Sequence, residues 1–223
     1  MNERTEWLIG KENLNKINKT NILLIGLGGV GGYAFESLIR SGFKNITIID
    51  YDTYDETNLN RQIYALNNTI GKSKVLAALE RAKQINGDIL VTTINKKADD
   101  NLLTDEFLTK YDYIIDACDD ILVKVLLINK CSSLKIKLIS CLGTANKTHP
   151  EKLEITTLAK TYNDPLAKKL RFNLKNNKKA LKTKVVWSSE TPLKQKKLGT
   201  ICSVPMSAGS LLTSYIINDI LGK

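Results

Sequence analysis

The stretch that decides the fold is residues 21–31, NILLIGLGGVG. It begins with the continuous apolar run NILLI, which is typical of a strand covered on both faces of a parallel sheet. The run is followed at once by a GxGxxG pattern at residues 26–31, and then by a predicted helix over residues 29–41. Glycines in such a turn let a phosphate approach the backbone, and the helix N-terminus offers free N–H groups. The stretch therefore predicts a nucleotide-binding turn with Gly26, Gly28, Gly29 and Gly31 against the cofactor.

Strand-like and helix-like segments alternate after this turn. The predicted strands are 21–26, 45–50, 89–94, 111–117 and 136–141, and the predicted helices are 29–41, 71–85, 104–109 and 121–134. This alternation predicts an α/β fold with a doubly wound, mainly parallel sheet of Rossmann type. Ligands of such sheets bind beyond the carboxyl ends of the strands, so we expect the chemistry just after Ile25, Ile49 and Ala117.

The regular alternation is lost from about Leu142. Only a strand over residues 183–187 and a final helix from about Ser207 are predicted there. We interpret this part as a C-terminal elaboration of the same domain. The expected single domain then has an N-terminal helical segment (1–20), a nucleotide-binding core (21–141) and a basic substrate-binding elaboration with the final helix (142–223).

Composition excludes several classes of protein. The 223 residues are 43% hydrophobic and 25% charged, as in an ordinary globular protein and unlike a disordered chain. The four cysteines contain no CxxC pair, which argues against a disulfide scaffold and a paired-cysteine zinc site. Polar residues interrupt every apolar run before about 18 residues, so no integral membrane segment is expected. The N-terminus carries acids and lacks a signal-peptide pattern, and we expect a cytoplasmic protein.

The net charge of +10 is concentrated in one segment. Residues 160–197 contain twelve Lys or Arg and two acids, and the remaining residues are neutral in sum. A localised cationic segment suits a polyanion such as nucleic acid. The alternative is a lysine-rich solvated surface, since lysine outnumbers arginine 28 to 5 in this chain.

Carboxylates and cations follow the second predicted strand. Asp50 ends this strand, 19 residues after Gly31, where an acid can hold ribose hydroxyls. NAD and ATP both satisfy this pattern. ATP is favoured by two nearby motifs, because Arg61 in NLNRQ (58–62) and Lys74 in GKSK (71–74) can return to the same crevice. Two cations beside a triphosphate stabilise the charge that develops in phosphoryl or nucleotidyl transfer.

The motif DACDD at residues 116–120 ends the fourth predicted strand. Carboxylates at this position face the ligand crevice and are hard-oxygen ligands suited to Mg²⁺. Asp119 is the favoured metal ligand. Asp116 lies within the strand end and is expected to orient backbone, and Asp120 is expected to cap the following helix.

Taken together, the motifs GxGGxG, DxD, NLNRQ, GxxK and DAxD resemble the ThiF/MoeB/HesA superfamily of ATP-dependent adenylating enzymes. The resemblance covers nearly the whole chain and implies that a substrate carboxylate is joined to AMP with release of pyrophosphate. It implies that Arg61, Lys74, Asp119 and Arg4 are catalytic, with Arg4 inserted into the partner subunit of a homodimer. The implied ATP and Mg²⁺ contacts are Gly26, Gly28, Gly29, Gly31, Asp50, Asp52, Asn58, Arg61, Gln62, Lys74 and, for the metal, Asp119.

One branch of the superfamily fits best. Residues 143–150 (GTANKTHP), 158–161 (LAKT), 164–167 (DPLA), 187–190 (WSSE) and 203–205 (SVP) are similar to the tRNA threonylcarbamoyladenosine dehydratases. The resemblance implies adenylation of the threonyl carboxylate of N6-threonylcarbamoyladenosine, followed by ring closure with loss of AMP and net loss of water. The basic segment then becomes the predicted tRNA surface.

Two departures from the branch limit the transfer of roles. His149 stands where an aspartate is expected. The segment just before Trp187 contains no cysteine, whereas some relatives carry one there, so a thioester step through such a residue is not available. Cys118, Cys131 and Cys141 are interpreted as core residues. Cys202 lies in a loop-like stretch, but the sequence shows no base beside it.

Other functions share part of this pattern. A MoeB- or HesA-like enzyme that adenylates the C-terminus of a ubiquitin-like sulfur-carrier protein has the same ATP-site residues, and a sulfur-transfer or carrier protein is then a partner. Such an enzyme has no need of the basic segment. A NAD-dependent oxidoreductase or a non-catalytic nucleotide-binding module is disfavoured by Arg61, Lys74 and Asp119.

Overall fold

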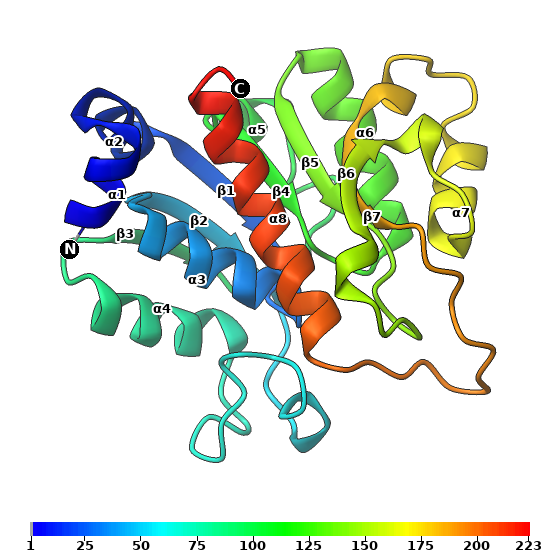
Figure 1. Ribbon diagram of the computed structural model, residues 1–223, viewed down its shortest axis with the longest axis horizontal. Helices are drawn as coiled ribbons and strands as arrows, with labels where there is room; N and C mark the ends of the chain where they lie inside the picture. Colours follow the sequence, from blue (N-terminus) through cyan, green and yellow to red (C-terminus); the bar gives the residue numbers. More distant parts are fainter. Residues whose placement is uncertain (1) are drawn as a thin grey trace.

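The computed structural model describes residues 2–223, which form one seven-stranded sheet (Figure 1). The strand order is β3-β2-β1-β4-β5-β7-β6, and every neighbouring pair is parallel except β6 and β7. The strands are β1 (Asn21–Ile25), β2 (Asn45–Ile49), β3 (Leu90–Ile94), β4 (Tyr113–Asp116), β5 (Lys137–Cys141), β6 (Leu153–Thr157) and β7 (Lys184–Ser188). The doubly wound, mainly parallel sheet expected from the sequence is confirmed.

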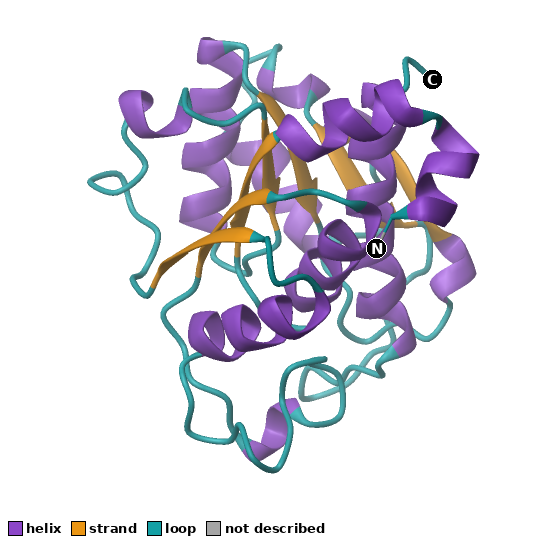
Figure 2. Ribbon diagram, turned by 90° about the vertical axis from the view of Figure 1, so that its left-hand side faces the viewer, coloured by secondary structure: helices purple, strands orange, loops and turns teal. Residues whose placement is uncertain are grey.

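Helices cover both faces of the sheet (Figure 2). One face packs against α2 (Lys11–Lys19), α3 (Gly31–Ser41), α4 (Lys74–Ile85) and α8 (Ser203–Ile220). The other packs against α5 (Asp105–Leu108), α6 (Ile121–Leu134) and α7 (Pro165–Asn173). The short helix α1 (Glu3–Ile9) buries none of its residues.

The central strand shows why the sequence run is continuously apolar. Ile22 and Leu24 belong to the core on one face of the sheet, and Leu23 and Ile25 to the core on the other. All four are at most 2% exposed. Burying each such side chain contributes about 1.5–3 kcal/mol, so the two helix layers hold β1 between them.

Two elements after Leu142 were not predicted. β6 is an antiparallel edge strand whose residues include Glu154, Thr156 and Thr157, so it lacks the apolar run of a buried strand. α7 begins with Pro165 directly after Asp164, whose carboxylate accepts the amide of Ala167. An aspartate cap followed by proline is a helix-start signal that was visible in the sequence.

Three predicted helix starts were wrong by a few residues. α3 begins at Gly31 and not at residue 29 because the glycine turn continues through Val30. α4 begins at Lys74 and not at residue 71 because Gly71 has a φ of 80° and Ser73 forms a bridge with Thr53. α8 begins at Ser203, earlier than Ser207, because a proline in the first turn of a helix breaks no helical hydrogen bond. Within residues 2–223, no helix has both the length and the apolar character needed to cross a bilayer.

Candidate active site

The loops that follow β1, β2, β4 and β5 enclose one cleft of about 1510 Å³. Because the carboxyl ends of parallel strands meet at one edge of a sheet, segments distant in sequence line it together. We call the loops after β1, β2 and β4 the nucleotide wall, and residues 143–147, 164–169 and 192–200 the substrate wall. The long loops of the nucleotide wall extend from the lower edge of the sheet in Figure 1.

The glycines of the turn after β1 have different roles. Gly26 has a φ of 92°, and a Cβ atom there would lie 2.8 Å from the carbonyl oxygen of Ala117. A Cβ atom on Gly31 would lie 1.8 Å from the carbonyl oxygen of Gly26, and Gly31 does not line the cleft. These two glycines let the turn close against the end of β4. Gly28, by contrast, faces open space in the cleft, so its missing side chain leaves room for a ligand.

Asp50 fixes the glycine turn to the end of β2. Its carboxylate accepts the amide of Leu27 at 2.6 Å and the amide of Asp52 at 2.9 Å. Burial raises the pKa of Asp50, while the two amide hydrogen bonds and the nearby Lys74 oppose that shift. The residue thus places a hydrogen-bond acceptor beside the turn, in the position where a ribose hydroxyl would be held.

Lys74 and Asp52 meet on the nucleotide wall. The Nζ atom of Lys74 lies 3.1 Å from the carboxylate of Asp52, and the Lys74 side chain is only 7% exposed. The backbone holds the pair in register, since the amide of Lys74 donates to the carbonyl of Asp52. The structure therefore brings Lys74 back to the crevice beside Asp50, 24 positions earlier in the chain. One acidic partner at Nζ leaves donors of this ammonium group for a second anion.

Arg61 extends along the glycine turn. Its guanidinium donates to the carbonyl of Thr57 and to the side chain of Asn60, and a Cβ atom on Gly29 would lie 3.4 Å from its Cγ. The fork geometry of a guanidinium suits a phosphate group above this turn.

Asn58 and Gln62 are buried beside Arg61, and both line the cleft. The side chain of Asn58 is engaged in a capping box with Asp55. The Oε1 atom of Gln62 is buried and has no hydrogen-bond partner among the described residues. A buried acceptor without a donor is costly, and a ligand amine or hydroxyl in the cleft would relieve it.

A buried ion pair fixes the first residue of the DACDD motif at the end of β4. Lys124 of α6 lies 3.0 Å from the carboxylate of Asp116, and both side chains are 0% exposed. Lys124 also donates to the carbonyl of Cys141 at 2.8 Å, and Ser140 donates to Asp116. Burial alone would lower the pKa of Lys124, but the charge of Asp116, the nearby Cys118 and Cys141 and the hydrogen bond to Asp116 together outweigh it, and the pKa is raised. The sequence signal was a lysine within the apolar helix 121–134, which was not singled out.

Asp120 caps α6 as predicted, since it accepts the amides of Leu122 and Val123. Asp119 lies between the buried Asp116 and this cap, and it is exposed in the cleft. Mg²⁺ is usually held by one or two carboxylates together with substrate phosphates and waters. Across residues 2–223, no group of three or more His, Cys, Asp or Glu is placed to hold a metal ion. A single exposed carboxylate in this cleft therefore fits Mg²⁺ that arrives with a nucleotide.

The cysteines and the histidine give no nucleophile in the cleft lined by the described residues. Cys118 lines it, but burial and the charge of Asp116 raise the pKa of this thiol well above its usual range. Cys131 and Cys141 are buried as predicted, and although Cys141 also lines the cleft, burial raises the pKa of both thiols to about 12. Cys202 lies 3.0 Å from the hydroxyl of Tyr33 and outside the cleft lining. His149 is exposed and contacts Glu151 at 2.6 Å.

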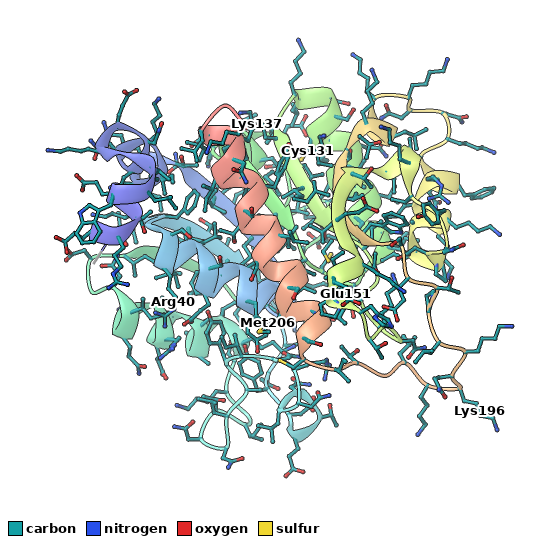
Figure 3. The ribbon with its side chains drawn as sticks, in the orientation of Figure 1. Arg40, Cys131, Lys137, Glu151, Lys196 and Met206 are labelled. Carbon is teal, nitrogen blue, oxygen red and sulfur yellow. The ribbon has the colours of Figure 1, made fainter. Side chains whose placement is uncertain are left out.

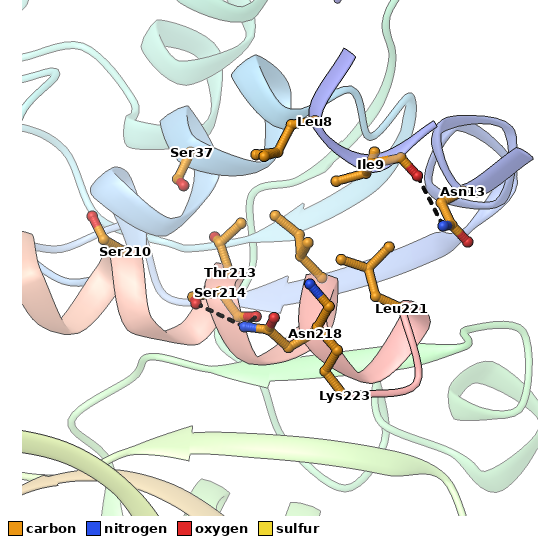
Figure 4. Close-up of a pocket in the computed structure, with 11 residues that line it drawn as sticks. Leu8, Ile9, Asn13, Ser37, Ser210, Thr213, Ser214, Asn218, Leu221 and Lys223 are labelled. Carbon is orange, nitrogen blue, oxygen red and sulfur yellow. Dashed lines mark hydrogen bonds between the residues drawn. The ribbon is translucent and has the colours of Figure 1, made fainter. Parts of the chain in front are cut away.

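Arg4 does not line the cleft of its own chain. It belongs to α1, on which Trp7 and Leu8 are 71% and 84% exposed. A second hollow of about 550 Å³ lies beside this helix, between Leu8 and Asn13 on one side and Thr213 and Leu221 on the other (Figure 4).

Comparison with known proteins supports one family. A model of the ThiF family matches residues 3–222. The chain is 33% identical over 237 residues to the tRNA threonylcarbamoyladenosine dehydratase of Bacillus subtilis, covering 98% of this chain and 93% of the relative. It is also similar to the crystal structure of the E. coli tRNA N6-threonylcarbamoyladenosine dehydratase in complex with ATP, with a TM-score of 0.93, 34% identity, and coverage of 98% of this chain and 93% of that chain. The molybdopterin-synthase adenylyltransferase of Haemophilus influenzae is 34% identical over 125 residues, covering 56% of this chain and 51% of the relative.

Proposed function

The chain belongs to the ThiF family, and we propose that it catalyses the ATP-dependent dehydration of N6-threonylcarbamoyladenosine in tRNA. The observation that carries this proposal is a cleft with two unlike walls. The nucleotide wall has the elements that an ATP site needs, and most of the substrate wall lies within residues 160–197, which carry the whole net positive charge. Relatives and structures that match nearly the full chain bear the same activity in their names.

The first half of the reaction would take place against the nucleotide wall. The threonyl carboxylate attacks the α-phosphorus of ATP, the bond to the pyrophosphate oxygen breaks, and an acyl-adenylate forms. Gly28 leaves space for the phosphates, and Asp50 holds the ribose. Arg61 and Lys74 place positive charge where the pyrophosphate develops negative charge, which is the main way such sites lower the barrier.

Asp119 would hold Mg²⁺ together with the phosphates. When bound, the ion neutralises part of the triphosphate charge. Asp116 and Lys124 position the backbone that carries Asp119. The buried pair is a positioning device, because neither of its side chains is exposed to the cleft.

The second half of the reaction needs no nucleophile from the protein. An oxygen or nitrogen of the same modified nucleoside attacks the activated carbonyl, AMP leaves, and a proton passes to solvent. Intramolecular closure of this kind is fast when the reacting groups are held close together. The raised pKa of Cys118 and the position of Cys202 outside the cleft are consistent with such a mechanism.

The tRNA would lie along residues 160–197. This segment gathers on one side of the molecule, in the yellow and orange part of the ribbon (Figure 1). Lys169 and Lys194 of this segment line the cleft, so the cationic surface continues into the site. Contacts of lysine with phosphates position an RNA without reading its sequence. A tRNA substrate would place the enzyme in the cytoplasm.

A homodimer would complete the site. The exposed Trp7 and Leu8 on α1 are apolar surface that a second subunit can cover. Arg4 on the same helix would then reach the ATP of the partner, where another cation beside the phosphates assists the transfer.

Nucleoside mass spectrometry tests the proposed function. The protein would be incubated with ATP, Mg²⁺ and tRNA that carries threonylcarbamoyladenosine, with a mild work-up that preserves a fragile ring. We expect ATP-dependent loss of one water from the modified nucleoside, and no change with the Asp119→Asn variant. Unchanged nucleoside, together with pyrophosphate exchange stimulated by a ubiquitin-like carrier protein, would replace this function with carrier-protein adenylation.

A further inference from the structure

The segment between β7 and α8 passes along the rim of the cleft without forming a helix or strand. Its residues 194–198, which we call the rim loop, read KQKKL and are all exposed. Figure 3 shows Lys196 at the outer end of this loop, away from the body of the molecule. Residues 191–202 contain three lysines and no acid. The rim loop is therefore a cationic projection beside the reaction site.

One residue closes both ends of the rim loop. The carbonyl of Asn146 accepts the amide of Leu193, and the amide of Asn146 donates to the carbonyl of Gly199, each at 2.7 Å. The side chain of Asn146 adds a third hydrogen bond, since its Oδ1 accepts the amide of Gly199 at 2.7 Å. Asn146 has a φ of 56°, a conformation that asparagine tolerates better than most residues. Leu193 and Gly199 are thus tied to the same point, and the lysines lie between them.

The backbone around Asn146 is fixed by buried contacts of the neighbouring Lys147. The neighbouring Lys147 lies 3.2 Å from the carboxylate of Asp164, with both side chains 1% exposed, and it also donates to the carbonyl of Gly143. Asp164 in turn caps α7. Separating a buried ion pair of this kind leaves an uncompensated charge in the interior, so the loop that carries Asn146 stays fixed to α7.

Glu190 holds the other side of the same loop. Its carboxylate accepts the amides of Thr148 and His149, both at 3.0 Å. Burial raises the pKa of Glu190, but these hydrogen bonds outweigh it, and the pKa lies below its usual range. The loop around Asn146 is therefore held both by Asp164 and by Glu190. The three hydrogen bonds of Asn146 to Leu193 and Gly199 then fix the position of the rim loop relative to the sheet.

The rim loop also adjoins the nucleotide wall. The side chain of Asn60, one residue before Arg61, donates to the carbonyl of Thr200 at 2.9 Å. Lys194 and Leu198 line the same cleft as Gly28 and Asp50. A polyanion whose reacting group enters the cleft must pass this rim, where hydrated ammonium groups attract phosphate in a salt-dependent way.

We propose that the rim loop contacts the tRNA phosphates that flank the reacting nucleotide, and that Asn146 is the positioning residue that presents its lysines. The proposal rests on the proposed function, because it names the contact through which that substrate is held. The lysines bind by charge, and Asn146 acts only through the loop.

The test compares two triple variants by steady-state kinetics with the modified tRNA. Lys194, Lys196 and Lys197 are changed to alanine in one, and Lys19, Lys83 and Lys110 in the other. The control lysines are exposed and precede β1, β3 and β4, so they lie near the amino ends of the parallel strands, opposite the carboxyl ends that line the cleft. We expect the rim-loop variant to raise the KM for tRNA at least tenfold, with the KM for ATP and the melting temperature unchanged. The salt dependence of tRNA binding should also fall by about 0.7 in logarithmic slope for each lost contact to single-stranded RNA.

Asn146→Gly tests the contribution of the Asn146 side chain to the position of the rim loop. Glycine keeps the positive φ and both backbone hydrogen bonds and removes only the side-chain acceptor. We expect a KM for tRNA several-fold higher, an unchanged kcat at saturating tRNA, and faster trypsin cleavage at Lys194, Lys196 or Lys197. Equal KM values and salt slopes for the rim-loop and control variants would overturn the proposal. An inactive wild-type protein would instead overturn the proposed function. The rim-loop proposal would still be tested in that case by comparing the tRNA affinities of the two triple variants in a direct binding experiment.

Discussion

The two walls of the cleft are built by different means. On the nucleotide wall, Gly26 and Gly31 bring backbone against backbone, and Asp50 holds the turn through two amides. On the substrate wall, the stabilising contacts are made by side chains. They are the ion pair of Lys147 with Asp164 and the hydrogen bonds of Glu190 with Thr148 and of Asn146 with Gly199. Both walls join residues that are distant in the chain, since Asp50 and Leu27 are 23 positions apart and the pairs of the second wall are 17 to 53 apart. The residues of the first wall, however, lie in short motifs with a general physical meaning. Short motifs therefore reveal the role of the first wall in the sequence, whereas for the second wall the sequence shows the segments but only the folded chain shows which of their residues pair.

The support of the substrate wall should show the greatest loss when it is changed. Lys147→Met keeps most of the side-chain volume but leaves Asp164 buried without its cation. We expect the free energy of unfolding to fall by about 3–5 kcal/mol, measured by urea denaturation at pH 7. The Lys147→Met/Asp164→Asn double variant should recover much of that loss, because no buried charge remains. A loss below about 1 kcal/mol for Lys147→Met would show that this wall does not depend on the pair.

The next effect concerns catalysis on the nucleotide wall. Lys74→Ala removes a cation whose Asp52 partner is half-exposed, so the fold should remain while the rate of pyrophosphate release falls roughly 10²–10³-fold. Lys72→Ala is the matched control, since Lys72 is exposed and pairs with Glu80 at 3.6 Å. Full activity of Lys74→Ala would remove this residue from the phosphate site.

The same contrast explains how much of the molecule could be predicted from the sequence. The parallel sheet, the alternation and the positions of the first five strands along the chain followed from apolar runs and glycine turns, and Asp120 as a helix cap followed from its position. Gly28, Asp50 and Lys74 were placed in one crevice because each lies at the end of a predicted strand or near the start of a predicted helix. The carboxyl end of every parallel strand lies at the same edge.

The remaining part of the site was hidden for physical reasons. Lys124 lies in an apolar helix, where its buried charge is compensated by Asp116 at the end of β4 and by the carbonyl of Cys141. β6 is an edge strand with polar residues, so it has no apolar run to detect. Asn146 acts through residues about 50 positions away, and neither spacing nor composition shows which loop will fold back onto it.

Substitutions at Gly28 and Gly31 should affect two different properties of the nucleotide wall, which are ATP affinity for Gly28 and stability for Gly31. Gly28→Ala adds a methyl group that meets no protein atom within 4 Å, so stability should be unchanged while the Kd for ATP rises about tenfold. Gly31→Ala places its methyl group 1.8 Å from a backbone oxygen, so the protein should lose stability. Isothermal titration with ATP and thermal melting distinguish the two effects. Equal ATP affinity for Gly28→Ala and wild type would mean that the nucleotide does not occupy the space above this turn.

A pH dependence on the substrate wall should be the weakest of these effects. The pKa of Glu190 is lower in the folded protein than in the unfolded chain, so its hydrogen bonds stabilise the fold above the unfolded value of about 4.3. That stabilisation is lost as the pH falls below about 4.3 and through the lower folded pKa. Glu190→Gln cannot ionise, so the stability of wild type relative to this variant should shrink by about 1 kcal/mol or less between about pH 6 and pH 3. Glu154→Gln, at an exposed site on β6, is the control. A constant difference between wild type and Glu190→Gln across this range would show that the amides of Thr148 and His149 do not bind the ionised carboxylate preferentially, and the second support of the Asn146 loop would then be steric.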